Sequence, residues 1–196
     1  MPPILLQTLC PSSVVKLGGS LLDLPDLVAR LNSLSHCWGP RPLLVVGGGE
    51  AADLVRAWDQ RFQIGEQQSH WLALDSLDLT ARLLTTLWPR SWVARIGQIE
   101  ECWLRHQYPI ISPREWFELA AASGTPSPPQ TWDTTTDTIA AWVAGLTQAR
   151  ELCLLKSVDN SRSLEEATEK GLIDAQFLQW VSTPVSWVNL RTGQAG

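Results

Sequence analysis

Short apolar runs alternate along this chain with longer segments in which apolar residues recur every three or four positions. The runs at 14–17, 43–46 and 152–155 are too short for helices, and their valine and leucine content is typical of buried parallel strands. The longer segments have the spacing of amphipathic helices, as in Leu24, Leu27, Val28, Leu31 and Leu34 or in Ala51, Leu54, Val55, Trp58 and Phe62. Strands and helices in alternation predict an α/β fold with a mainly parallel central sheet.

The remaining elements are predicted from the same patterns. The segment 124–130 contains three prolines, which remove backbone donors, so it is expected to be an exposed loop. The mixed segment 91–111 holds short strands such as 92–96, and its order is left open. Further helices are predicted over 66–87, 136–150 and 174–181, and a last strand over 185–190.

Glycines directly follow two of the apolar runs. Gly18 and Gly19 follow the first run, and a triple glycine at 47–49 follows the second. Glycine at the end of a strand lets backbone N–H groups converge on an anion, and Lys16 adds a positive charge beside the first turn. One such turn alone is more often only a tight turn. Two of them with a lysine predict phosphate binding, although neither has the spacing of a P-loop or of a dinucleotide-binding turn.

Composition limits the class of protein. A chain of 196 residues with 44% hydrophobic residues fits a single domain over 1–196. A net charge of −5 argues against nonspecific nucleic-acid binding. Since no apolar run is long enough to span a bilayer and the N-terminus lacks the pattern of a signal peptide, we expect no membrane association and a cytoplasmic location. The four cysteines and three histidines are scattered, which predicts reduced thiols and no structural zinc.

Two carboxylates, Asp133 and Asp137, lie four residues apart at the predicted start of the helix 136–150, so we expect one face to carry both. Taken singly, Asp133 could be an N-cap and Asp137 a partner of the helix dipole. The three threonines between them have little helical preference, however. Hydroxyl groups beside carboxylates suit an anionic or metal-bridged ligand, and together with the glycine turns they favour a functional site.

Four motifs resemble, in order, those of the amino acid kinase family. They are KLGGS at 16–20, VVGGG at 45–49, TDTIAA at 136–141 and LLKSVD at 154–159. The resemblance implies a three-layer αβα sandwich. It also implies a kinase that uses ATP and Mg²⁺, with the acceptor bound by the N-terminal part and the nucleotide by the C-terminal part.

The resemblance also implies roles for individual residues. Lys16 would neutralise the transferred phosphoryl group, and Asp137 would orient the catalytic lysines. Many family members carry a second lysine in a late Gly-Gly-Met segment, which this chain lacks. Lys156 is the expected substitute, and Lys170 is a weaker candidate. ATP would be bound by Lys16, Gly18, Gly19, Ser20, Lys156 and Asp159. The acceptor would be bound by Gly47, Gly48, Gly49, His70 and Asp133.

Three functions stay open on the sequence. The stretch QSHWLA at 68–73, the Trp-Asp at 132–133 and the Lys-Ser-Val-Asp at 156–159 resemble the branch of the family that phosphorylates an aminomethylfuran phosphate for methanofuran, a one-carbon carrier. A uridylate kinase shares the same glycine turns. A noncatalytic nucleotide-binding or storage protein is the third alternative, favoured by the short C-terminal part. In each case the partner is a small molecule, and a homo-oligomer is compatible with the sequence.

Overall fold

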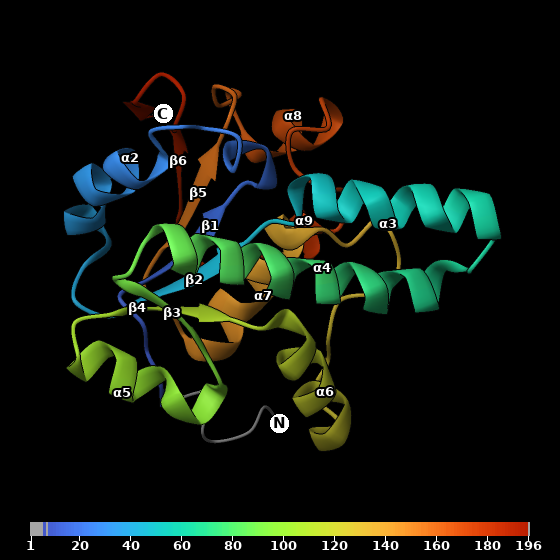
Figure 1. The fold of residues 1–196 in the computed structure, drawn as a ribbon, viewed down its shortest axis with the longest axis horizontal. Helices are drawn as coiled ribbons and strands as arrows, with labels where there is room; N and C mark the ends of the chain where they lie inside the picture. The colour runs from blue at the N-terminus through green and yellow to red at the C-terminus, as the bar shows by residue number, and fades with distance from the viewer. Residues whose placement is uncertain (1–5, 7, 196) are drawn as a thin grey trace.

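The central sheet of this protein has seven strands in the order β3-β4-β2-β1-β5-β6-β7 (Figure 1). The structure is a computed structural model that describes residue 6 and residues 8–195. The first six strands pair in parallel, and β7 pairs antiparallel to β6, which confirms the mainly parallel sheet. The strands are β1 (Ser13–Leu17), β2 (Pro42–Val46), β3 (Ser91–Ala94), β4 (Tyr108–Ile111), β5 (Leu152–Lys156), β6 (Val185–Asn189) and β7 (Gln194–Ala195).

Helices connect the parallel strands and cover the sheet. Those of at least six residues are α2 (Leu27–Leu34), α3 (Gly49–Phe62), α4 (Glu66–Leu87), α5 (Ile99–Leu104), α6 (Pro113–Ser123), α7 (Thr136–Thr147) and α8 (Leu164–Glu169). Shorter turns of helix are α9 (Phe177–Trp180), η1 (Gly19–Leu21), η2 (Ser35–Trp38) and η3 (Ile96–Gln98). Of the helices that the structure describes, none combines the length and apolar character needed to cross a bilayer.

Each strand presents alternate residues to opposite faces of the sheet, because the side-chain period of a strand is two. Val14 packs in one hydrophobic cluster with residues of α7, whereas Val15 and Leu17 pack in a second cluster with residues of α2. The same alternation in β5 separates Leu154 from Leu155. Helices therefore lie on both faces, which confirms the three-layer αβα sandwich.

Several predicted elements differ from the structure. The helix over 174–181 is reduced to the single turn of α9. The loop 124–130 lacks regular structure as expected, but Thr125 and Pro128 are buried, so it is not fully exposed. The segment 91–111 resolves into β3, η3, α5 and β4, and the first of these ends at Ala94 rather than at 96.

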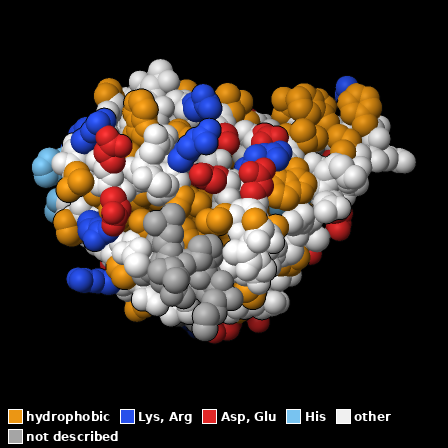
Figure 2. Space-filling view, turned by 90° about the horizontal axis from the view of Figure 1, so that it is seen from below, with side chains coloured by type: hydrophobic (Ala, Val, Ile, Leu, Met, Phe, Trp, Pro, Cys, Tyr) orange, Lys and Arg blue, Asp and Glu red, His pale blue; other side chains and the backbone are white. Residues whose placement is uncertain are grey.

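The apolar stripe predicted on α3 is mostly exposed to solvent. Val55 is buried, but Leu54, Trp58 and Phe62 are 50%, 41% and 65% exposed. Helices α3 and α4 form an antiparallel hairpin that projects from the body of the molecule (Figure 1). Figure 2 shows apolar side chains gathered at this projecting end. The spacing was correctly helical, but its apolar face does not pack on the sheet.

Candidate functional site

The sheet places two lysines on one face, at the carboxyl ends of neighbouring strands. Lys16 of β1 lies opposite Leu154 of β5, so Lys156 lies two residues further along β5 and points to the same face. That face is covered by α7, whose first turn carries Asp137. Lys16 Nζ is 2.9 Å from Asp137 Oδ1, and Lys156 Nζ is 2.8 Å from Asp137 Oδ2. One carboxylate thus bridges both predicted lysines.

This lysine–aspartate–lysine cluster is buried and electrostatically coupled. Lys16, Asp137 and Lys156 are 5%, 4% and 9% exposed. Burial tends to raise the pKa of Asp137, but the charges of Lys16 and Lys156 outweigh it and hold the pKa below its ordinary value. Burial, together with repulsion from Lys16, lowers the pKa of Lys156. Two ammonium groups against one carboxylate leave the cluster with a net positive charge when all three are ionised.

Asp174 holds the helix that carries Asp137, and sequence reasoning missed it. Its carboxylate accepts hydrogen bonds from the N–H groups of Thr135 and Thr138, each at 3.2 Å, and from both threonine hydroxyl groups. The hydroxyl of Thr135, the N-cap of α7, in turn accepts from the N–H of Asp137 at 3.3 Å. The first turn of α7 is therefore fixed by a residue that lies just before α9.

Asp174→Asn is expected to lower the free energy of unfolding by about 1–2 kcal/mol, because a charged acceptor at the start of a helix is replaced by a weaker, neutral one. We also expect the first turn of α7, which carries Asp137, to be less firmly held. Urea unfolding measures the first effect. The matched control is Asp26→Asn, an exposed carboxylate before α2 whose side chain caps no helix; an equal effect of both substitutions would contradict the role of Asp174.

The two glycine turns touch each other through their backbones. A Cβ placed on Gly19 would lie 2.2 Å from the nitrogen of Gly49, and one on Gly47 would lie 2.5 Å from the nitrogen of Gly19. The N–H of Gly18 donates to Leu155 O and extends the pairing of β1 with β5, so it is already used. By contrast, no backbone carbonyl among the described residues accepts from the N–H groups of Gly19, Gly48 and Gly49. These three groups remain free for an anion.

A cavity of about 820 Å³ opens beside Lys16 and the glycine turns, and we call it the main cavity; Asp137 and Lys156 lie behind Lys16 and do not line it. Its lining includes predicted residues from both turns: Lys16, Gly19, Ser20, Gly47, Gly48 and Gly49. Arg56 of α3 also lines it and was not predicted; its guanidinium lies 4.8 Å from the centre of the Trp132 ring and 2.8 Å from Asp53. Arg56 lies in α3, the helix that begins at Gly49 of the second glycine turn. In the sequence, only its position on one face of that predicted helix could have indicated that it lines the site.

The remaining residues predicted to bind ATP lie in contacts of their own. Ser20 Oγ donates to Ser157 Oγ at 2.9 Å, and Asp159 accepts from Asn189 Nδ2 at 2.7 Å. Lys170, the weaker candidate for a second catalytic lysine, directly follows α8; its side chain is half exposed and pairs with Glu166 of that helix. Lys156 is therefore the lysine that joins Lys16 at Asp137.

A small pocket of about 90 Å³ adjoins the main cavity and is lined by His70, Trp132, Thr134 and Ile139 among others. The His70 ring is 3% exposed, and its Nε2 is buried without a hydrogen-bond partner. Burial lowers the pKa of His70, so the neutral ring is favoured. Asp133 is exposed and precedes Thr135, the N-cap of α7. The expectation that Asp133 and Asp137 share a helix face is therefore wrong, because α7 begins only at Thr136.

A parallel sheet that ends in paired glycine turns beside buried lysines is the kind of α/β fold that holds anionic ligands at the carboxyl ends of its strands. Residues 12–160, about three quarters of the chain, match the sequence pattern of the amino acid kinase family. The protein belongs to the amino acid kinase family. Its sequence is 24% identical over 147 residues to the [5-(aminomethyl)furan-3-yl]methyl phosphate kinase of Methanocaldococcus jannaschii, covering 74% of this chain and 66% of that enzyme.

Solved structures support the same fold. The uridylate kinase of Archaeoglobus fulgidus superposes with a TM-score of 0.55 at 20% identity, covering 76% of this chain and 64% of that one. The UMP kinase of Ureaplasma parvum superposes with a TM-score of 0.63 at 15% identity, covering 94% of this chain and 92% of that one. The chain thus spans slightly less than two thirds of the archaeal relatives, but nearly the whole of the Ureaplasma enzyme.

Proposed function

We propose that this protein transfers the γ-phosphoryl group of ATP to a small phosphorylated acceptor. The observation that carries the proposal is the lysine–aspartate–lysine cluster beneath the two glycine turns. An acceptor phosphate oxygen is ionised at neutral pH, so it can attack the γ-phosphorus and release ADP without a general base. Such a transfer needs positioning and charge neutralisation, which buried lysines and free N–H groups supply.

The arrangement suggests where each substrate binds. The nucleotide phosphates would meet Gly19, Ser20 and Lys156, with Asp159 further along the same side. The acceptor phosphate would meet Gly48 and Gly49, with Arg56 as a second cation from α3. No group of three or more potential metal ligands occurs among residues 6 and 8–195. Mg²⁺ would therefore be held chiefly by the nucleotide, as is usual for this ion, and would neutralise its phosphate oxygens.

For the acceptor we propose an aminomethylfuran phosphate, as in the Methanocaldococcus relative. The small pocket supports an acceptor with a compact ring, because its volume is only about 90 Å³. Its polar lining includes the imidazole Nε2 of His70, which has no hydrogen-bond partner among the described residues. Asp133, just outside this pocket, would pair with the ammonium group. The positions of His70 and Asp133 and the similarity to the Methanocaldococcus enzyme support these roles. For a kinase of this kind we propose a cytoplasmic location.

An ADP-release assay with an acceptor panel tests the proposed function. We expect turnover with [5-(aminomethyl)furan-3-yl]methyl phosphate and little with UMP. Turnover with UMP in preference would favour a uridylate kinase. Binding of ATP without ADP release for any acceptor would favour the noncatalytic alternative and would contradict the proposal.

His70→Ala is expected to raise KM for the acceptor while leaving KM for ATP nearly unchanged, because His70 lines the small pocket and lies away from the nucleotide turn. Steady-state kinetics with each substrate varied in turn measures this split. His36→Ala, which removes an exposed histidine in η2, is the control. An equal loss for both substrates would instead assign His70 to packing against Trp71 and Phe117, whose rings it meets edge to face.

Asp133→Asn is expected to lower kcat/KM for the aminomethylated acceptor severalfold, since an ion pair of an exposed carboxylate contributes up to about 1 kcal/mol. An analogue with methyl in place of the amine should be barely affected. Comparing the two acceptors isolates the ammonium contact. If both acceptors lose equally, Asp133 does not bind the ammonium group.

A further inference from the structure

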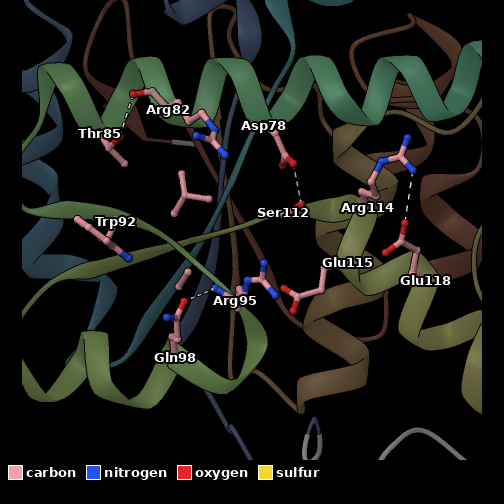
Figure 3. Close-up of a pocket in the computed structure, with 12 residues that line it drawn as sticks. Asp78, Arg82, Thr85, Trp92, Arg95, Gln98, Ser112, Arg114, Glu115 and Glu118 are labelled. Carbon is pink, nitrogen blue, oxygen red and sulfur yellow. Dashed lines mark hydrogen bonds and ion pairs between the residues drawn. The ribbon is translucent and has the colours of Figure 1, made fainter.

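A second cavity of about 540 Å³ lies apart from the main cavity, at the carboxyl ends of β3 and β4 (Figure 3). We call it the edge cavity. Helix α4 borders both cavities: Leu79, Thr80 and Leu83 line the main cavity, whereas Asp78 and Arg82 line the edge cavity. The carboxyl ends of parallel strands are where open α/β sheets bind ligands. The edge cavity therefore lies at a second position on the sheet where a ligand could bind, and the proposed kinase reaction does not use this cavity.

Two arginines in the edge cavity form no ion pair within the described part of the chain, although Arg82 lies close enough to Asp78 to oppose the rise that burial causes in the pKa of that carboxyl. Arg82 enters from α4, and Arg95 enters from the turn after β3 on the opposite side (Figure 3). Neither makes an ion pair with any residue that the structure describes. A third arginine, Arg114, is already paired with Asp75 and Glu118. In a protein of net charge −5, two unpaired guanidinium groups facing one cavity are available for an anion.

The acidic side chains of the edge cavity make contacts with neighbouring groups of the protein. Glu115 accepts a hydrogen bond from the N–H of Ile96 at 3.1 Å. Asp78 accepts from the hydroxyl of Ser112 at 2.9 Å through Oδ2, while its Oδ1 is buried without a partner. Burial raises the pKa of Asp78, so its charged form is less favoured in the cavity than in water.

An apolar surface completes the edge cavity. Trp92 of β3 lines it and is 53% exposed, with Val93 beside it. A large indole left half exposed next to cationic groups suits a ligand that combines an organic group with negative charge.

We propose that the edge cavity binds a small organic dianion, whose phosphate or carboxylate groups are held between Arg82 and Arg95 and whose carbon skeleton packs on Trp92. Guanidinium groups bind phosphate and carboxylate oxygens alike. The shared chemistry is therefore the double negative charge on a small organic molecule. The cavity volume fits a ligand of metabolite size rather than a polymer.

The indole N–H signal of Trp92 in the NMR spectrum of the ¹⁵N-labelled protein is assigned with Trp92→Phe. It reports on the edge cavity and on a neighbouring cavity of about 270 Å³ that Trp92 also lines, but not on the main cavity, and the arginine variants below separate the first two. Phenyl phosphate and succinate are titrated separately, with uncharged phenol as control. We expect a saturable shift of the Trp92 signal with at least one of the two anions, and only a weak response to phenol. The anion that binds with the higher affinity shows whether the cavity prefers a phosphate ester or a dicarboxylate.

The double variant Arg82→Gln/Arg95→Gln should bind the effective anion about tenfold more weakly or worse, and each single variant should show an intermediate loss. Arg61→Gln, with the same change of charge at the far end of α3, should bind as the wild type does. Unchanged signals elsewhere in the spectrum show that the variants are folded. The proposal is overturned if neither anion gives a saturable shift, if phenol binds equally well, or if the double variant binds like the wild type. None of these outcomes depends on the kinase activity.

Discussion

Lys16→Ala is expected to lower kcat of phosphoryl transfer by roughly 100- to 1000-fold, the usual cost of losing one charge-stabilising donor in a closed site. The lysine is needed most as negative charge shifts toward the leaving oxygen, so the loss should appear in kcat more than in KM. The protein should remain folded, because Asp137 keeps its ion pair with Lys156 at 2.8 Å. Single-turnover kinetics at saturating acceptor measures the effect.

Lys156 and Lys170 make a matched pair for the same assay. Lys156→Ala should reduce kcat substantially, whereas Lys170→Ala removes a lysine from a surface pair in α8 and should leave kcat unchanged. A wild-type kcat for Lys16→Ala would show that the cluster is not the transfer site. An effect of Lys170→Ala alone would move the second catalytic lysine to α8.

Asp137→Asn is expected to abolish activity and to lower the free energy of unfolding by about 3–5 kcal/mol, since it removes the carboxylate that bridges two buried ammonium groups. The substitution keeps the size of the side chain and the N–H that binds Thr135. The loss therefore reports on charge rather than on packing. Urea unfolding over a range of pH values measures it.

The pH dependence of this loss has a definite sign. In the wild type the folded-state pKa of Asp137 is depressed, so its stabilising contribution is present above the ordinary aspartate pKa and is lost as the pH falls through the lower folded value. The deficit of Asp137→Asn should therefore shrink in acid. It should also shrink in alkali, because Lys156, whose pKa burial has lowered, then gives up its proton. A deficit that stays constant from acid to alkali would contradict an electrostatic role for Asp137.

The sequence located the cluster because each of its members belongs to a local motif. Lys16 precedes a double glycine, Asp137 lies in a threonine-rich helix start, and Lys156 ends an apolar run. The helix predicted from residue 66 to about residue 87 corresponds to α4, since its apolar period is long. Local pattern and the parallel register together determine these features.

Contacts between distant segments were not predictable in this way. Asp174 is 36 and 39 residues away from its threonine partners, and nothing in its own neighbourhood indicates a cap for another helix. The exposed stripe on α3 has the same spacing as a buried one, so periodicity cannot tell the two apart. The edge cavity depends on Arg82, Arg95 and Ser112, which come from three separate elements and share no motif.

The backbone contact between Gly19 and the second glycine turn limits which features of the proposed site can change by substitution. The two turns are separated only by backbone atoms, so the gap between the proposed donor and acceptor phosphates is a property of the peptide chain and not of any side chain. Substitutions around the small pocket or at Arg56 can then alter which acceptor is accepted while the transfer distance stays constant. For the proposed reaction, the choice of acceptor and the geometry of transfer would then depend on different parts of the chain, so the acceptor could change while the transfer step stays the same.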